Sequence, residues 1–232
     1  MKTGLLVCDH INENFRHIAP DYPSMFRRIL PGSDLIPFMV IEGAFPENAE
    51  VCDAYIVTGS RFSVYDEVEW VLRLKSFVRE IYVSGKKYVG VCFGHQMLGE
   101  ALGGKVAKSA KGWCVGVHQF SMLKEESWMA PFQPQVNLLM SCQDQVVVLP
   151  ENSIHLASSP DCEIGMFRVG EHMLGIQAHP EFTPEYDRAL MESRVERIGK
   201  EKVEKGIQSL QKQTEGALVA RWITEFFSKT ES

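Results

Sequence analysis

The segment around Cys92 restricts the fold of this chain more than any other part of the sequence. It reads Gly90-Val91-Cys92-Phe93-Gly94, between a short apolar run and a helix-like run that ends at Gly103-Gly104. This G-x-C-x-G pattern is typical of a nucleophile elbow, a sharp turn from a strand into a helix with the nucleophile at its tip. Glycines suit such a turn because it leaves little room for a nearby Cβ. The pattern therefore predicts a strand, then Cys92, then a helix.

Cys92 is a candidate nucleophile because it precedes the expected helix. The free N–H groups at a helix N-terminus carry partial positive charge, which favours a thiolate over a thiol. A buried, unreactive cysteine is the simpler interpretation, since free cysteines are among the most buried residues of proteins. The pattern alone hardly separates these two interpretations.

A second motif lies further along the chain, in Gly175-Ile176-Gln177-Ala178-His179-Pro180-Glu181-Phe182. Pro180 favours an extended backbone at His179, which keeps the imidazole at the end of the expected strand. Glu181 is close enough in sequence to turn back toward that imidazole, fix its tautomer and stabilise its protonated form. Taken alone, the motif also fits a surface histidine followed by an ordinary helix-start glutamate.

The first part of the chain alternates strand-like and helix-like runs. The expected strands and helices are, in order, Gly4–Cys8, Asp21–Leu30 (helix), Asp34–Ile41, Ala54–Val57, Glu67–Val83 (helix), Tyr88–Val91 and His95–Leu102 (helix). This alternation predicts an α/β fold with a parallel sheet and helices on both faces. After Gly104, short strand-like runs broken by Pro, Gly, Asn and Asp predict an antiparallel extension.

The C-terminal part, residues 184–232, is predicted to be helical and charged. Thr183 and Pro184 suit the N-cap and first position of a helix. The charged run Glu192–Glu215 predicts a solvated helical excursion, and Arg221–Phe227 predicts a closing amphipathic helix. Without a repeat or linker, residues 1–232 are expected to form a single domain.

Composition excludes several classes of function. The net charge of -6 gives no basic surface for nucleic acid or anionic lipid, and no apolar run is long enough to span a membrane. The N-terminal apolar run stops at Asp9, so it predicts a first strand rather than a signal peptide, and a cytoplasmic protein. The 6 cysteines include no C-x-x-C pair, which argues against zinc. We expect no metal or organic cofactor.

Together, the two motifs resemble those of the class I glutamine amidotransferases. The resemblance extends from Ala54 to Phe182. It implies a flavodoxin-like three-layer sandwich with a mostly parallel central sheet. It also implies a triad in which Cys92 is the nucleophile, His179 the general base and acid, and Glu181 the orienting carboxylate.

The resemblance further implies an oxyanion hole made by backbone N–H groups of the Gly59-Ser60 loop and of Phe93. Backbone donors suit this role because they are fixed before charge develops on the substrate oxygen. The family commonly has a second glycine where this chain has Ser60, so the sequence leaves open which N–H serves.

The substrate pocket is implied at Gln96, Cys142 and Gln143. Gln96 matches the family glutamine that helps bind the amino-acid end of the substrate. Cys142-Gln143 stands where family members often have His-Gly, so the γ-glutamyl compound that fits is left open.

The implied reaction is acyl transfer through a γ-glutamyl thioester on Cys92, which water then hydrolyses. In one version the protein is a glutaminase that supplies ammonia to a separate synthetase, because the chain is too short to hold both. In the other it is a free-standing γ-glutamyl peptidase, since Met166-Phe167-Arg168 and Gly175-Ile176-Gln177 are similar to plant γ-glutamyl peptidases. The rivals are an α/β-hydrolase with a cysteine elbow, whose carboxylate normally precedes the histidine, and a non-catalytic binding module.

Overall fold

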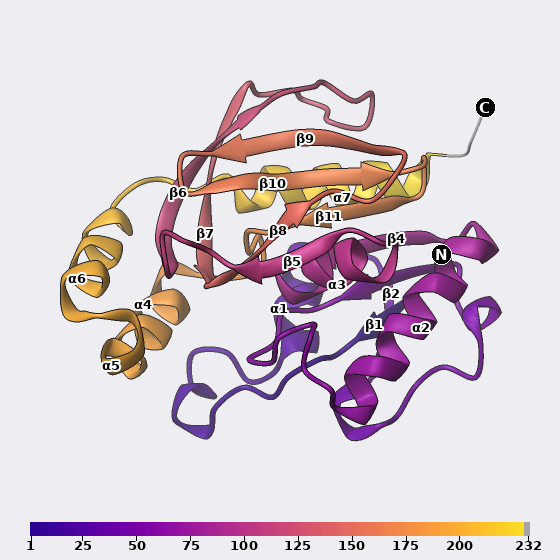
Figure 1. Ribbon diagram of the computed structural model, residues 1–232, viewed down its shortest axis with the longest axis horizontal. Coiled ribbons are helices and arrows are strands. Elements are labelled where there is room, and N and C mark those ends of the chain that lie inside the picture. The colour runs from indigo at the N-terminus through magenta and orange to yellow at the C-terminus, as the bar shows by residue number, and fades with distance from the viewer. Residues whose placement is uncertain (230–232) are drawn as a thin grey trace.

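The computed structural model describes residues 1–229, which share a nine-stranded sheet (Figure 1). The strand order is β2-β1-β3-β4-β11-β10-β9-β6-β7. The strands of this sheet are β1 (Lys2–Leu6), β2 (Asp34–Phe38), β3 (Ala54–Val57), β4 (Lys87–Val91), β6 (Cys114–Met122), β7 (Gln135–Cys142), β9 (Ser153–Ser159), β10 (Cys162–Val169) and β11 (Met173–Ile176). A separate two-stranded sheet pairs β5 (Lys105–Lys108) with β8 (Asp144–Val148).

The large sheet has a parallel half and an antiparallel half. Strands β2, β1, β3, β4 and β11 pair in parallel. Strands β11, β10, β9, β6 and β7 pair in antiparallel fashion. The edge strand β2 contains Pro37, and an edge is where a residue without an N–H is tolerated. The α/β prediction with an antiparallel extension is confirmed.

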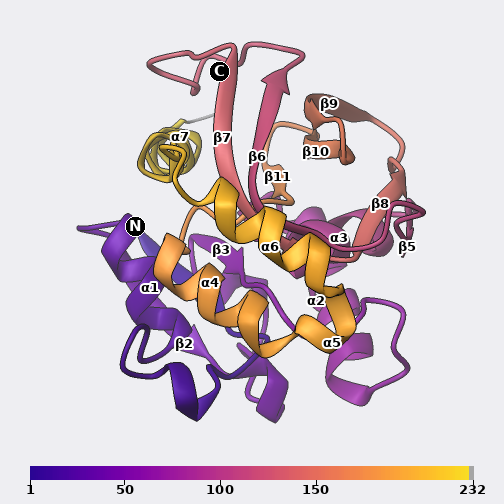
Figure 2. The same ribbon diagram turned by 90° about the vertical axis from the view of Figure 1, so that its left-hand side faces the viewer.

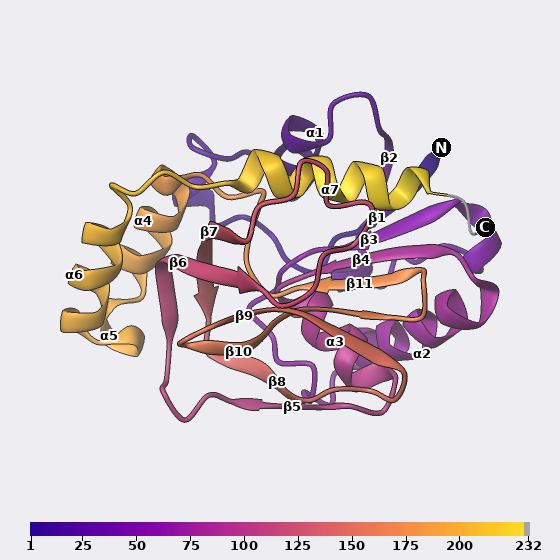
Figure 3. The same cartoon turned by 90° about the horizontal axis from the view of Figure 1, so that it is seen from above.

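Helices lie on both faces of the sheet, as predicted. The helices are α1 (Tyr22–Ile29), α2 (Glu69–Ser84), α3 (Phe93–Ala101), α4 (Pro184–Ser193), α5 (Val195–Ile198), α6 (Lys200–Ser209) and α7 (Gly216–Ser228), with short 3-10 turns at η1 (Glu13–Phe15), η2 (Val40–Glu42) and η3 (Ala49–Val51). Figure 3 shows α1 and α7 on one side of the parallel strands and α2 and α3 on the other.

Each face has its own apolar core. Phe26 of α1 and Trp222 of α7 pack in one cluster with Val89 of β4. Leu74 of α2 packs in the other cluster with Tyr88 of β4. Neighbouring residues of β4 therefore point to opposite faces, so the strand before Cys92 is held from both sides.

The C-terminal helices α4, α5 and α6 form a layer at the end of β6 and β7 (Figure 2). Helix α6 packs so closely on β6 that a Cβ at Gly116 would lie 2.7 Å from the carbonyl oxygen of Gly206. Val203 of α6 and Met191 of α4 are buried there against Val115. The expectation of a merely solvated excursion is therefore wrong, because one face of this charged segment is part of a core.

Residues 230–232, the last part of the predicted C-terminal segment, lie outside the described residues. Within residues 1–229, each helix is either too short or too polar to cross a membrane.

Candidate active site

The parallel strands bring several loops to one edge of the sheet. Strands β1, β3, β4 and β11 run in the same direction, so the loops after them meet at their carboxyl ends. Such an edge is where open α/β sheets carry their binding sites. The two motifs of the sequence follow β4 and β11, which are direct neighbours.

The elbow predicted at Cys92 is present. Cys92 is the N-cap of α3 and has a φ of 52°, a strained value for a residue with a side chain. Its N–H donates to the carbonyl of Ile176 in β11 at 2.9 Å. A Cβ at Gly90 would lie 2.7 Å from the backbone N of His95, and one at Gly94 would lie 2.9 Å from the Cβ of Val57. Both glycines therefore permit the close approach of strand and helix.

The His-Pro-Glu motif forms a buried pair. His179 Nδ1 and Glu181 Oε1 are 2.7 Å apart, and Glu181 is fully buried. Phe182 stacks on the imidazole with ring centroids 3.8 Å apart. The N–H of His179 donates to the Leu139 carbonyl at 2.9 Å, and Arg28 Nη2 donates to the Glu181 carbonyl at 2.5 Å. The imidazole is thus fixed in place and orientation.

The electrostatic setting of His179 favours the imidazolium. Burial lowers the pKa of His179, but the charge of Glu181 and the charge and hydrogen bond of Cys92 outweigh it and raise the pKa to about 10. At neutral pH the ring therefore holds its proton. A charged imidazole between a carboxylate and a sulfur is suited to deliver a proton to a leaving group.

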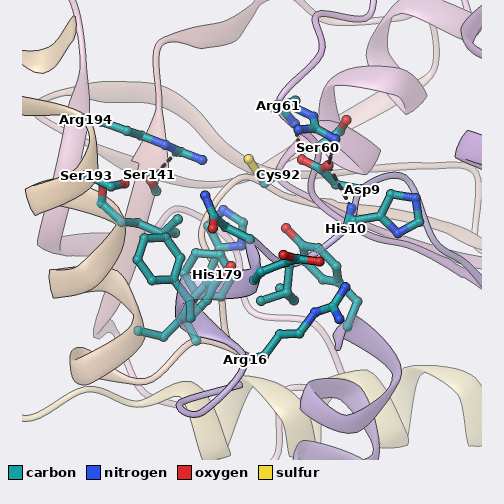
Figure 4. A pocket seen from close by; sticks show the side chains of 18 residues that line it. Asp9, His10, Arg16, Ser60, Arg61, Cys92, Ser141, His179, Ser193 and Arg194 are labelled. Atoms are coloured by element: carbon teal, nitrogen blue, oxygen red, sulfur yellow. Dashed lines mark hydrogen bonds and ion pairs between the residues drawn. The ribbon is translucent and has the colours of Figure 1, made fainter. Parts of the chain in front are cut away.

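Cys92 and His179 face the same space. Both line a cavity of about 450 Å³, which we call the larger cavity. A Cβ at Gly59 would lie 3.0 Å from His179 Cε1 and 3.8 Å from the Cβ of Cys92, so Gly59 lies beside both side chains. Figure 4 shows the Cys92 sulfur and His179 together in this cavity.

The three residues predicted for the oxyanion hole surround Cys92. Gly59 is adjacent to His179, Ser60 lines the larger cavity, and Phe93 begins α3. The first N–H groups of a helix have no partner within it, so the N–H of Phe93 is available. Ser60 Oγ donates to the Cys8 carbonyl at 2.8 Å, which ties this loop to the end of β1. The oxyanion role itself stays a prediction.

The residues predicted to bind substrate line a second cavity, which Cys92 also lines. This smaller cavity has a volume of about 140 Å³ and includes Gln96, Cys142 and Gln143. Gln96 Nε2 donates to the backbone carbonyl of Asp144 at 2.7 Å and to Gln177 Oε1 at 3.1 Å. The amide of Gln96 is thus held by the protein, and its contact with a substrate stays a prediction.

The structure adds charged residues that the motifs did not indicate. Asp9, after β1, accepts hydrogen bonds from the N–H groups of His10 and Arg61 at 2.8 Å, and pairs with the Arg61 guanidinium at 3.1 Å. Arg194, at the joint of α4 and α5, lines both cavities. The position of Asp9 after the first parallel strand was a usable signal, whereas nothing near Arg194 in the sequence points to a site.

Within residues 1–229, no group of three or more His, Cys, Asp or Glu side chains is placed to hold a metal ion. The prediction that the reaction needs no cofactor is not tested by this finding.

Comparison with known proteins identifies the family of the chain. The family model for Glutamine amidotransferase class-I matches residues 43–196, which include both the elbow and the His-Pro-Glu motif. The chain belongs to this family. The class I amidotransferase fold also has a solved counterpart in a glutamine amidotransferase from Thermotoga maritima, with a TM-score of 0.79 and 17% identity over 99% of this chain and 100% of that one.

Curated relatives of this amidotransferase domain have more than one name. Gamma-glutamyl peptidase 3 of Arabidopsis thaliana is 31% identical over 156 residues, which cover 64% of this chain and 63% of the peptidase. The glutamine-hydrolysing GMP synthase of Bacteroides fragilis is 30% identical over 149 residues, which cover 64% of this chain but 28% of the synthase. The matches therefore span less than two thirds of either relative.

Proposed function

We propose that this protein is a cysteine-dependent amidohydrolase that cleaves the γ-amide bond of glutamine or of a γ-glutamyl compound. The observation that carries the proposal is the buried His179–Glu181 pair, 2.7 Å apart, in the cavity that Cys92 also lines. An α/β-hydrolase with a cysteine elbow fits less well, because the carboxylate on the imidazole follows the histidine in sequence.

In the proposed reaction, the Cys92 thiolate attacks the γ-carbonyl carbon and forms a C–S bond. The N–H of Phe93, with that of Gly59 or Ser60, holds the developing oxyanion. His179 donates its proton to the departing nitrogen as the C–N bond breaks, and Glu181 stabilises the imidazolium. Water, which gives a proton to the now neutral His179, hydrolyses the thioester; the C–S bond breaks, and the γ-carboxylate, the Cys92 thiolate and the imidazolium result.

The relatives support two forms of this activity. The peptidase name supports a free-standing γ-glutamyl peptidase, and the larger cavity beside Cys92 is consistent with a substrate bigger than glutamine. The GMP synthase name supports the glutamine-hydrolysing form, in which a separate synthetase would use the ammonia. Of the two, the size of the cavity favours the peptidase.

The test is glutamate release by the purified protein from glutamine and from γ-glutamyl dipeptides. We expect release that is lost in Cys92→Ala, together with a thioester adduct on Cys92 after an acid quench, found by mass spectrometry. Glutaminase activity that needs an added synthetase would favour the second form. Release that survives in Cys92→Ala would refute the proposal.

A further inference from the structure

The position of His179 indicates which cavity holds the γ-glutamyl part of the substrate and which holds the leaving amine. In the proposed reaction the imidazole protonates the departing nitrogen, so the leaving amine must lie on the His179 side of Cys92. His179 lines the larger cavity alone, whereas Gln96 and Gln143 line the smaller cavity alone. The γ-glutamyl part therefore belongs in the smaller cavity and the leaving amine in the larger one.

The larger cavity has room for a leaving group much bigger than ammonia. Its volume is about 450 Å³, against about 140 Å³ for the smaller cavity. Ammonia is about as large as water, whose share of liquid volume is about 30 Å³. The space on the leaving side thus suits an amine with a substantial body.

The wall of the larger cavity is aromatic in the region beyond His179. Phe182 stacks on the imidazole and meets Tyr186 edge-on, with ring centroids 4.8 Å apart. Tyr186 in turn meets Phe15, from the turn after β1, at 6.3 Å. Phe182 and Tyr186 are buried, so Phe15, which is only partly buried, is the ring that offers an apolar surface to a side chain of the leaving group.

The charges around the larger cavity leave a cation free. Its arginines are Arg16, Arg61 and Arg194, and its carboxylates are Asp9 and Glu13. Arg61 pairs with Asp9 at 3.1 Å. Among the described residues, Arg16, Arg194 and Glu13 of this set form no ion pair, so the two remaining arginines outnumber the remaining carboxylate. Arg194 Nη1 donates to Ser141 Oγ at 3.4 Å, whereas the side chain of Arg16 is exposed (Figure 4). The balance of charge at the rim therefore favours an anionic group.

We infer that the larger cavity binds a leaving group that is an amino acid or short peptide with an apolar side chain and a free carboxylate, which Arg16 contacts. The inference rests on the proposed function, because it takes the side of the leaving amine from the role of His179. The C–S bond forms first, the amide C–N bond then breaks, and the proton of His179 goes to the departing nitrogen. Water then releases glutamate, so the products are glutamate and the free amino acid or peptide.

The test compares three substrates that give the same product, glutamate. They are glutamine, γ-Glu-Phe, and γ-Glu-Phe with its C-terminal carboxylate converted to an amide. We expect kcat/KM for γ-Glu-Phe to exceed that for glutamine by roughly tenfold to hundredfold, the gain typical of burying one large apolar side chain. Capping the carboxylate should lower kcat/KM by about fivefold, because an ion pair with an exposed arginine is screened by water.

The variant Arg16→Gln should remove the preference for the free carboxylate, so that γ-Glu-Phe and its amide have similar values of kcat/KM. Arg197→Gln is the matched control, because Arg197 lines the smaller cavity alone. It should keep the preference for the free carboxylate, whatever it does to overall rate.

The outcomes separate the inference from the proposed function. Cys92-dependent turnover of glutamine that equals or exceeds turnover of γ-Glu-Phe would overturn the inference and leave the proposed function standing. An unchanged carboxylate preference in Arg16→Gln would overturn the assignment of Arg16. No glutamate from any of the three substrates, with no adduct on Cys92, would refute the proposed function and the inference with it.

Discussion

Replacing Glu181 by Gln tests the electrostatic role of the buried pair most directly. The change keeps the size of the side chain but removes the charge that lies 2.7 Å from His179 Nδ1. Both side chains are buried, so water cannot replace the lost charge. A hydrogen bond to a charged group is worth about 1.5–3 kcal/mol, and about 1.4 kcal/mol is a factor of ten in rate. We therefore expect kcat/KM to fall roughly ten- to hundredfold.

The same change should alter the pH dependence. The pKa of His179 is about 10 in the folded protein, above the ordinary value of 6.5, and Glu181 is the main group that raises it. Stability from this proton is therefore fully present below pH 6.5 and is lost as the pH rises through about 10. In Glu181→Gln the pKa of His179 should be lower, so this loss should be smaller and end at a lower pH, and the alkaline limb of kcat/KM should also move to lower pH.

The assay is glutamate release together with urea unfolding, both followed from neutral to alkaline pH. Glu185→Gln is the matched control, because Glu185 is exposed in the first turn of α4 and loses the same charge. Activity of Glu181→Gln equal to that of the control, or an alkaline limb that moves upward, would refute the reasoning.

The other predictions concern reactivity and stability. A glutamine-like chloroketone should label Cys92 before any other cysteine, which peptide mapping checks. His179→Ala should lower kcat/KM more than Glu181→Gln, which steady-state kinetics checks. Gly94→Ala should lower the free energy of unfolding by about 1–3 kcal/mol, because its Cβ would lie 2.9 Å from that of Val57; an unchanged urea midpoint would show that the strand can shift. Burial raises the pKa of Asp187 from its ordinary value of 3.8 to about 7. The free energy of unfolding should therefore fall as the pH rises from 3.8 through about 7. In Asp187→Asn, urea titrations at acidic and alkaline pH should show a smaller fall in the free energy of unfolding. An unchanged dependence on pH would show that Asp187 does not cause it.

The sequence predicted those parts of the molecule that depend on neighbours along the chain. The bounds of Ala54–Val57 match β3, and the helix expected at Glu67–Val83 is α2, Glu69–Ser84. The elbow and the His-Pro-Glu motif were also predictable, because each is set by a few adjacent residues. The strand Lys105–Lys108 was missed, since a run this short with lysines at both ends has no clear apolar alternation.

The rest of the site could not be predicted because it comes from distant segments. Asp9, Arg16 and Arg194 reach the cavities from the loop after β1, from the turn after η1 and from the joint of α4 and α5. Nothing in their local sequence links them. The charged stretch around Arg194 fitted a solvated helix by composition, but its small and apolar residues, such as Gly206, pack it against β6.

The place of β11 in the sheet has a consequence for how the protein is made. This strand is the last of the sheet in the sequence, yet it lies between β4 and β10 in the middle. A chain emerging from the ribosome therefore has a long interval in which β4 lacks one neighbour and the thiol at its tip lacks its imidazole. A nascent or truncated chain that ends before residue 173 would carry an open strand edge, prone to wrong pairing, and an incomplete active site.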